Sequence, residues 1–343
     1  YWGSRTSDGS QTAYALLGNR NPVLAEAARR NLELLEKCTH EGILHGGLHH
    51  YHRGELPCIH HTFCHSKALA TVLDYKDYKQ TNFNFWEEQP DISLPRETNN
   101  TEATNFNEVD TWLVEKNQWS ATITAYDWEY DNVKTGHASG GSLTMLYHQD
   151  LGPILSASMV EYEMHEPHNM QRHRDEIEMS LTPKLVYEEK GKQYRSDNYY
   201  KARVEKSDID NRILFEIKGK LVDKYQKDPD WGNIYYNIQY IFSEDQVKIK
   251  IDYNVKNNES DIESKKIRYY LPVISKSEEK VKLTNVRKIN IMKSQNITIS
   301  SNYSYKCLIE PEKRIFNQVP GLEAFPLFYD LNSEKELEID IKV

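Results

Sequence analysis

The stretch IYYNIQYIFSEDQVKIKIDYNV (residues 234–255) decides the fold class of this chain. Apolar and polar side chains alternate on both sides of the turn SEDQ, and a period of two is typical of paired strands with one buried face. The alternation returns around Ile213–Ile217 and Leu337–Val343. Since no helical period of comparable quality follows Tyr78, we predict that residues 111–343 form a large antiparallel β-sandwich.

The first part of the chain has a helical period instead. Asn21 and Pro22 are a typical N-cap and first-turn pair, and apolar residues then recur at helical spacing. A second helix is predicted around residues 61–73. Residues 79–110 are rich in Asn, Thr and Glu and lack a clear period. We therefore interpret them as the connection between an α-helical part, residues 1–78, and the β part.

The bulk composition limits the possible partners. The chain has 343 residues and a formal net charge of −9, so neither a nucleic acid nor an anionic membrane surface is the expected partner. No apolar run of about 18 residues occurs, so we expect no membrane span. The four cysteines are too few for a disulfide scaffold in so long a chain. The chain begins at Tyr1 without an initiator Met, which predicts a processed or truncated product.

Acid–base chemistry is expected between His40 and Tyr75. This segment holds eight of the 13 histidines of the chain. Within it, Tyr51 is flanked by three histidines and Arg53. A phenol among cationic or hydrogen-bond-donating groups has its pKa pulled below the usual value of about 10, toward use as a base. The alternative interpretation is an ordinary packed ring in a loop.

Two other kinds of site are compatible with the same cluster. His61 and His65 lie four positions apart and would share a helix face that could bind a metal, but the glutamate of a zinc-protease helix is missing. Cys58 or Cys64 beside a histidine is a candidate nucleophile, although no G-x-S-x-G motif occurs. A solvated row of histidines explains the same pattern. We predict neither a metal nor a cofactor.

The β part contains two further polar segments of interest. Residues 135–159, TGHASGGSLTMLYHQDLGPILSASM, place His137 in a turn rich in Gly and Ser, immediately before an apolar strand. A histidine on such a loop is well placed to face a ligand, or is a solvated turn residue. Residues 161–176, EYEMHEPHNMQRHRDE, form a second cationic cluster that includes Arg172. Its alternative interpretation is a polar loop.

Together these segments resemble the polysaccharide lyases of the heparinase II/III-like and alginate-lyase-like group. The resemblance depends on GSRTSDGSQTAYALLG, on GGLHHYHRGELPCIHHTFCHSKALA and on residues 135–159. It implies an α+β multidomain fold, in which a partial N-terminal (α/α) toroid precedes an antiparallel β-sandwich. His137 matches the first histidine of the family's Gly-His-x-His-x-Asp run. Ser139 and Gly141 replace its second histidine and its aspartate, so the structural zinc of some members is not expected.

The resemblance also implies a reaction, β-elimination at a uronic acid of an acidic polysaccharide or oligosaccharide. The implied site consists of Tyr51 as base and acid, His61 and His137 as further catalytic residues, and His45, His50, Arg53 and Arg172 as substrate-binding residues. A periplasmic or secreted location, and the missing N-terminal portion of the toroid as a partner, follow from the same resemblance. The alternative function is a non-catalytic carbohydrate-binding or adhesion protein.

Overall fold

The chain divides into two compact units. A computed structural model describes residues 12–18, 20–44, 59–75, 92–94, 97, 101–125, 129–130, 133–134, 138–158, 179–257, 266–317, 321–331 and 336–343. Unit 1 comprises Tyr1–Thr98, Glu163–Ile177 and Phe316–Leu322, and unit 2 comprises Asn99–Tyr162, Glu178–Ile315 and Glu323–Val343. The division predicted above, with its connection at residues 79–110, stays a prediction. Strand β3 (Thr101–Phe106) lies inside the predicted connection.

Unit 1 contains the helices that the periodicity predicts. Helix α2 (Pro22–Lys37) begins after Asn21, whose side chain accepts a hydrogen bond of 3.0 Å from the backbone N–H two residues later. Two buried alanines of α2 belong to the same small apolar cluster as Val72 of helix α3 (Ile59–Asp74). Strands β1 (Thr39–His40) and β2 (Ile43–Leu44) form a two-stranded sheet between the helices in sequence.

The expected α+β fold with a partial toroid is wrong. In the part of the chain that the structure describes, α-helix is limited to residues 12–17, α2 and α3, whereas strands dominate. The described structure is nearly all β, with three large antiparallel sheets and no N-terminal (α/α) toroid. The physical reason lies in the sequence, since a toroid needs many paired helices and the 3.6-residue period covers only two segments long enough to form them.

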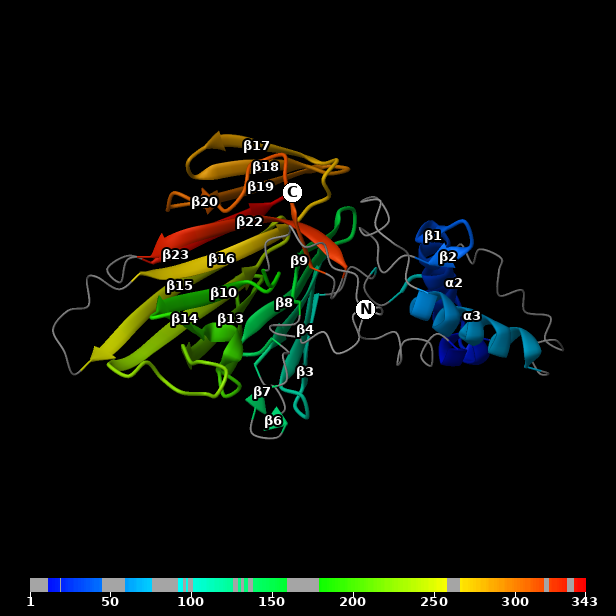
Figure 1. The fold of residues 1–343 in the computed structure, drawn as a ribbon, viewed down its shortest axis with the longest axis horizontal. Coiled ribbons are helices and arrows are strands. Elements are labelled where there is room, and N and C mark those ends of the chain that lie inside the picture. Colours follow the sequence, from blue (N-terminus) through cyan, green and yellow to red (C-terminus); the bar gives the residue numbers. More distant parts are fainter. Residues whose placement is uncertain are drawn as a thin grey trace. The chain divides into compact units, whose positions relative to one another are not determined.

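The strands of unit 2 form three large sheets (Figure 1). The five-stranded sheet has the order β3, β4 (Thr111–Lys116), β5 (Trp119–Thr124), β8 (Ser142–His148), β9 (Gly152–Ser156). The eight-stranded sheet has the order β12 (Arg203–Ile209), β13 (Arg212–Lys220), β14 (Gly232–Phe242), β15 (Gln246–Asn257), β23 (Leu337–Lys342), β19 (Asn296–Ser301), β18 (Lys288–Met292), β17 (Lys280–Asn285). Antiparallel pairing is thus confirmed, in three sheets where a single sandwich was expected.

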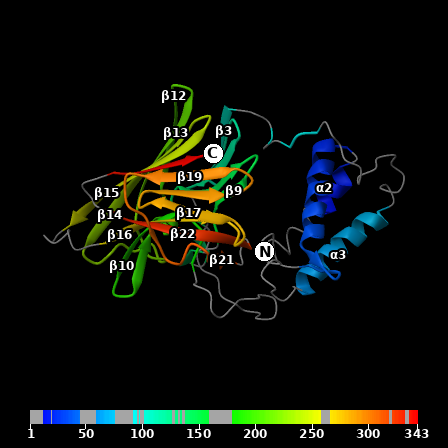
Figure 2. The ribbon, with the colours of Figure 1, turned by 90° about the horizontal axis from the view of Figure 1, so that it is seen from above.

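The third large sheet carries much of the polar chemistry described below. Its order is β11 (Lys192–Arg195), β10 (Lys184–Glu189), β16 (Ile267–Ile274), β22 (Leu322–Leu331), β20 (Lys306–Cys307), and β21 (Ile315–Asn317) also pairs with β22. The 3-10 helix η4 (Ser196–Asn198) directly follows β11. A separate two-stranded sheet is formed by β6 (Glu129–Tyr130) and β7 (Val133–Lys134). Figure 2 shows the strands of unit 2 from a second direction.

The hairpin predicted from residues 234–255 is confirmed. Strands β14 and β15 are paired antiparallel, with Ile238 opposite Ile251 and Phe242 opposite Val247. These four side chains are buried, as the alternation requires. They belong to one apolar core that strands of all three large sheets share. Burying each such side chain contributes about 1.5 to 3 kcal/mol, so this core is the main source of stability in unit 2.

The described helices of the chain are short or contain many polar residues. None of those within the described residues is long and apolar enough to cross a bilayer.

Candidate functional site

The residues predicted to carry the chemistry lie almost entirely outside the described part of the chain. Those outside it are Tyr51, His137, His45, His50, Arg53 and Arg172. His61 lies in helix α3, whose backbone is described, although its side chain is not. Their roles therefore stay predictions. The structure does describe residues of unit 2 next to two of the predicted segments. These are the residues that follow His137 and the residues on both sides of the segment that carries Arg172.

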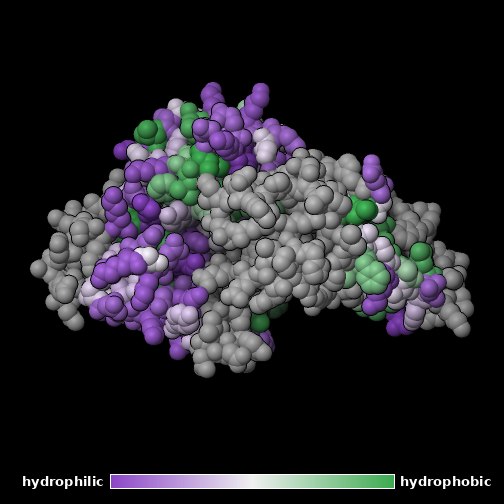
Figure 3. Space-filling view, in the orientation of Figure 1, coloured by the Kyte–Doolittle hydropathy of each residue, from purple (hydrophilic) through white to green (hydrophobic). Residues whose placement is uncertain are grey.

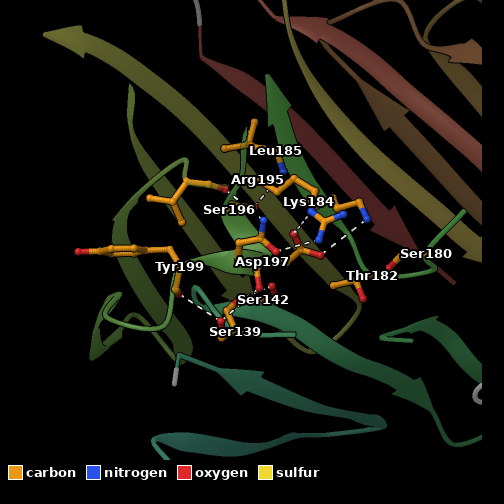
Figure 4. Close-up of polar contacts among 12 residues, drawn as sticks. Ser139, Ser142, Ser180, Thr182, Lys184, Leu185, Arg195, Ser196, Asp197 and Tyr199 are labelled. Atoms are coloured by element: carbon orange, nitrogen blue, oxygen red, sulfur yellow. Dashed lines mark hydrogen bonds and ion pairs between the residues drawn. The ribbon is translucent and has the colours of Figure 1, made fainter. Parts of the chain in front are cut away.

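The turn that follows His137 is held by an unusual set of hydrogen bonds. Ser139 is fully buried, and its hydroxyl lies 3.2 Å from both the carbonyl oxygen of Asp197 and that of Tyr199 (Figure 4). Its backbone N–H donates to the same Asp197 oxygen at 3.1 Å. The residue two positions after His137 is thus fixed to helix η4, far along the sequence.

Two glycines make this close approach possible. Gly140 and Gly141 have φ values of +71° and +73°, which side-chain-bearing residues rarely adopt. A Cβ on Gly140 would lie 1.9 Å from the carbonyl oxygen of Ser196, and one on Gly141 would lie 2.2 Å from Cγ2 of Ile217. The Gly-rich character of the segment is therefore a packing requirement. The packing against Ile217 thus leaves no room for a side chain at position 141.

Two tyrosines of strand β14 hold the same turn from the core side. The Tyr236 hydroxyl donates to the carbonyl oxygen of Gly140 at 2.8 Å, and the Tyr240 hydroxyl donates to that of Gly141 at 3.2 Å. Burial raises the pKa of Tyr236 and of Tyr240 well above the usual value, so both phenols stay protonated and keep donating. The sequence contained a signal for this role, because buried tyrosines on the inward face of a strand need a hydrogen-bond partner.

A charged cluster lies directly behind the turn. The fully buried Asp197 carboxylate is 3.7 Å from Nζ of Lys184 and 3.3 Å from Nε of Arg195, both of which are also buried (Figure 4). Arg195 donates through Nη2 to Oδ1 of Asn198 at 2.8 Å. Since the Asp197 carbonyl accepts from Ser139, the turn and the buried charges form one polar network, hereafter the η4 cluster (Ser139, Lys184, Arg195, Asp197). Sequence reasoning missed it, because its members come from three separate segments.

The described residues before and after the segment that carries Arg172 belong to unit 2, and those after it lead in sequence to Lys184 of the η4 cluster. The described residues on its two sides are joined, since the Ser158 hydroxyl lies 3.2 Å from that of Ser180 and accepts from the N–H of Leu181 at 2.8 Å. Ser158 and Thr182 are further joined by two hydrogen bonds of 3.2 Å. Thr182 precedes Lys184 by two residues. The described residues that flank the Arg172 segment are therefore held to one another by hydrogen bonds within unit 2.

Metal binding finds no support in the described residues. Among them, no group of three or more His, Cys, Asp or Glu side chains is placed to hold an ion. The described histidine of unit 2, His148, is buried with its ring packed edge-on against Trp119 at a centroid distance of 4.8 Å. Its Nδ1 accepts a 3.3 Å hydrogen bond from the N–H of Asp150. This is a structural histidine, and the expectation of no metal stays a prediction.

Two models of known protein families match this chain. Residues 103–343 match the model of the ulvan lyase C-terminal domain, and residues 1–90 match that of the ulvan lyase N-terminal domain. The chain belongs to the ulvan lyase family. The two matched regions contain all the predicted site residues of this chain. The narrower resemblance to heparinase II/III-like and alginate-lyase-like enzymes stays a prediction.

One relative is similar along the whole chain. It is a broad-specificity ulvan lyase of Formosa agariphila, 35% identical over 351 residues, which cover 100% of this chain and 52% of the relative. The chain thus spans about half the length of this relative.

Solved structures show only weak likeness. A 4-alpha-glucanotransferase from Thermococcus litoralis is 12% identical, with 98% of this chain and 49% of that chain covered and a TM-score of 0.42. A galactose 1-epimerase from Lactobacillus acidophilus is 8% identical, with 71% and 98% covered and a TM-score of 0.36.

Proposed function

We propose that this protein is a polysaccharide lyase that cleaves ulvan, or a related glycan containing uronic acid, by β-elimination. The observation that carries the proposal is the match of both ulvan lyase domains along the chain, together with a relative of that activity at 35% identity. A periplasmic or secreted location belongs to the same proposal, because a polymeric substrate is met outside the cytoplasm.

The reaction sets the chemical demands on the site. The proton on C5 of a uronic acid is poorly acidic until the neighbouring carboxylate is neutralised, so the site needs cationic or donating groups on that carboxylate and a base for the proton. Removing the C5 proton forms the C4–C5 double bond, and the C4–O bond breaks. The leaving oxygen then takes up a proton. No external oxidant or reductant is required.

We assign these roles as the sequence predicts. Tyr51 removes the C5 proton and returns a proton to the leaving oxygen, and His61 and His137 complete the catalytic set. His45, His50, Arg53 and Arg172 bind the substrate, and the groups that neutralise its carboxylate are His45, His61, Arg53 and His137. The η4 cluster supports the assignment of His137, because it fixes Ser139, two residues later in the chain, and electrostatic stabilisation works best from preorganised groups.

The test is incubation of the protein with ulvan, with other uronic-acid polysaccharides and with a neutral polysaccharide. Ultraviolet absorbance follows the unsaturated uronate, and mass spectrometry identifies the new chain end. We expect unsaturated product from ulvan and none from the neutral polymer. If ulvan bound without any unsaturated product, the lyase proposal would be wrong and the non-catalytic carbohydrate-binding function would replace it.

A further inference from the structure

A polar hollow lies on strands β10 and β16, among residues that have no role in the proposed reaction. It has a volume of about 390 Å³ and is lined by Val186, Glu188, Lys190, Gly191, Lys266, Arg268 and Tyr270. We call these seven residues the β10–β16 hollow. Where the described surface of unit 2 is coloured in Figure 3, it is mainly hydrophilic.

The strand register explains why these side chains meet. Val186 is paired with Arg268, and the next pair along the strands, Leu185 with Tyr269, belongs to the buried core. Because successive side chains point to opposite faces, Arg268 and Tyr270 lie on the face away from the core. Lys190 stands at the hairpin tip between β10 and β11, where its φ is +50°. Paired backbones and a tight turn therefore fix the positions of these groups.

Two of the three cations in the hollow make no ion pair with any residue that the structure describes. Lys190 and Lys266 are exposed, and neither takes part in an ion pair among the residues that the structure describes. Glu188 is the one acidic side chain of the lining. In a chain with a formal net charge of −9, an excess of positive charge in one hollow favours an anionic ligand.

The third cation is held in place beside an aromatic wall. Nε of Arg268 lies 3.0 Å from Oδ1 of Asp330, and its guanidinium carbon lies 5.4 Å from the centroid of the Phe328 ring. That ring stacks with Tyr270 at a centroid distance of 5.7 Å and an interplanar angle of 30°. Tyr270 is the aromatic residue of the lining, and a tyrosine next to fixed cations suits a sugar ring with a charged substituent, because the sugar stacks while the substituent accepts hydrogen bonds.

We propose that the β10–β16 hollow binds an anionic group, carboxylate or sulfate, on an acidic polysaccharide chain. The class of ligand depends on the proposed function. The described lining contains none of the seven predicted site residues, and we assign it the role of holding a stretch of polymer without taking part in bond cleavage. It contributes to the binding of long substrates. The binding of short oligosaccharides that reach only the predicted site does not depend on it.

The test compares the full chain with the double variant Lys190→Gln/Lys266→Gln. The matched control is Lys280→Gln/Lys282→Gln, which removes the same charge from exposed positions of strand β17. Calorimetry measures binding to an unsulfated polyuronate and to a sulfated neutral polysaccharide. We expect the hollow variant to bind at least one of them about 3- to 10-fold more weakly, as for the loss of two exposed charge pairs, and the control to bind like the parent. The polymer whose binding weakens identifies the group as carboxylate or sulfate.

Unchanged binding of both polymers by the hollow variant, or an equal loss in the control, would overturn the proposal. Product formation from ulvan by the parent, measured in parallel, separates this proposal from the lyase proposal. If the parent makes no unsaturated product but the hollow variant alone loses binding, the lyase proposal fails and the hollow stands. If the parent makes product and the hollow variant binds like the parent, the hollow fails and the lyase proposal stands.

Discussion

Among the described residues, each unit contains a buried carboxylate between two cations, and the two arrangements are built differently. In unit 1, Glu26 of helix α2 is bound by Arg29 and Arg30, one turn further along the same helix, at 2.6 to 2.7 Å. In unit 2, Asp197 lies between Lys184 and Arg195 at 3.3 to 3.7 Å, within a structure dominated by apolar packing.

The difference concerns what each carboxylate supports. The described apolar cluster of unit 1 consists of four buried residues, three of them alanines, so ionic contacts carry a larger share of its stability. Arg30 also binds Glu97, which joins α2 to a position 67 residues away. The apolar core of unit 2 extends through three sheets. The Asp197 carboxylate neutralises two buried cations, and the main-chain carbonyl of the same residue is the point to which the turn after His137 is attached.

The largest effect is expected from removing Asp197. In Asp197→Ala, Lys184 and Arg195 stay buried without their shared carboxylate, and losing one partner of a buried pair costs about 3 to 5 kcal/mol of unfolding free energy. Urea unfolding followed by tryptophan fluorescence measures it. Glu338→Ala removes a carboxylate that pairs with Lys250 at the surface and is the control, with a loss below about 1 kcal/mol. Equal losses of unfolding free energy in the two variants would show that the Asp197 carboxylate matters no more for stability than a carboxylate at the surface.

A smaller loss is expected from Gly141→Ala, which tests the turn itself. The new Cβ meets Ile217 at 2.2 Å, so strain and overpacking together cost about 2 to 4 kcal/mol. Gly152→Ala is the matched control, because Gly152 also has a φ of +73° but nothing within 4 Å of the added atom. We expect the control to lose only about 1 to 2 kcal/mol in urea unfolding. Identical losses would mean that contact with Ile217 does not hold the turn.

The ionic contacts of unit 1 are tested by acid. Hydrogen bonds from Arg29, and secondarily from Arg30, lower the pKa of Glu26 from 4.5 to about 2. Because the folded pKa is below the unfolded one, the contribution is complete above about pH 5 and is lost as the pH falls toward 2. We expect Glu26→Gln to destabilise α2 by about 2 kcal/mol at pH 7 and by much less at pH 3. Hydrogen exchange of the α2 amides measures it, and a loss independent of pH would contradict the ionic account.

The smallest effect is expected at His148. Burial lowers the pKa of this imidazole, so the unfolded chain binds a proton more readily than the folded chain does. Stability contributed by neutral His148 is therefore present above the unfolded pKa of about 6.5 and is lost as the pH falls below it. Thermal unfolding of unit 2 between pH 7 and pH 5 should vary less in His148→Asn than in the parent. The same slope in both proteins would assign the pH dependence to other groups.

The two carboxylates also show which contacts can be predicted from the sequence. The run from Glu26 to Arg30 places acid and bases at helical spacing, so its pairs follow from local periodicity once the N-cap at Asn21 is recognised. The hairpin of residues 234–255 follows from alternation in the same way. Asp197 does not, because its partner Lys184 is brought near only by the pairing of β10 with β11, and no local pattern encodes which strands pair.

The toroid prediction failed for a related reason. It came from the resemblance of short motifs to a family whose members contain a toroid. The segment to which the toroid was assigned has only two runs of helical periodicity long enough to form helices. The functional role predicted for the segment around Ser139 and Gly141 stays a prediction. Its glycines and serines serve the attachment of the turn to η4, a purpose that becomes visible only when Ile217, Tyr236 and Asp197 are in place around them.

The account as a whole depends on an elimination with Tyr51 as the base, and one rate measurement tests it most directly. The rate of unsaturated product formation from ulvan is compared for the parent, for Tyr51→Phe and for Tyr225→Phe, a control at an exposed tyrosine of unit 2. We predict that Tyr51→Phe lowers the rate at least about 100-fold while calorimetry finds nearly unchanged binding, and that the control matches the parent. Parental turnover in Tyr51→Phe would contradict the account and make His61 the next candidate for the base.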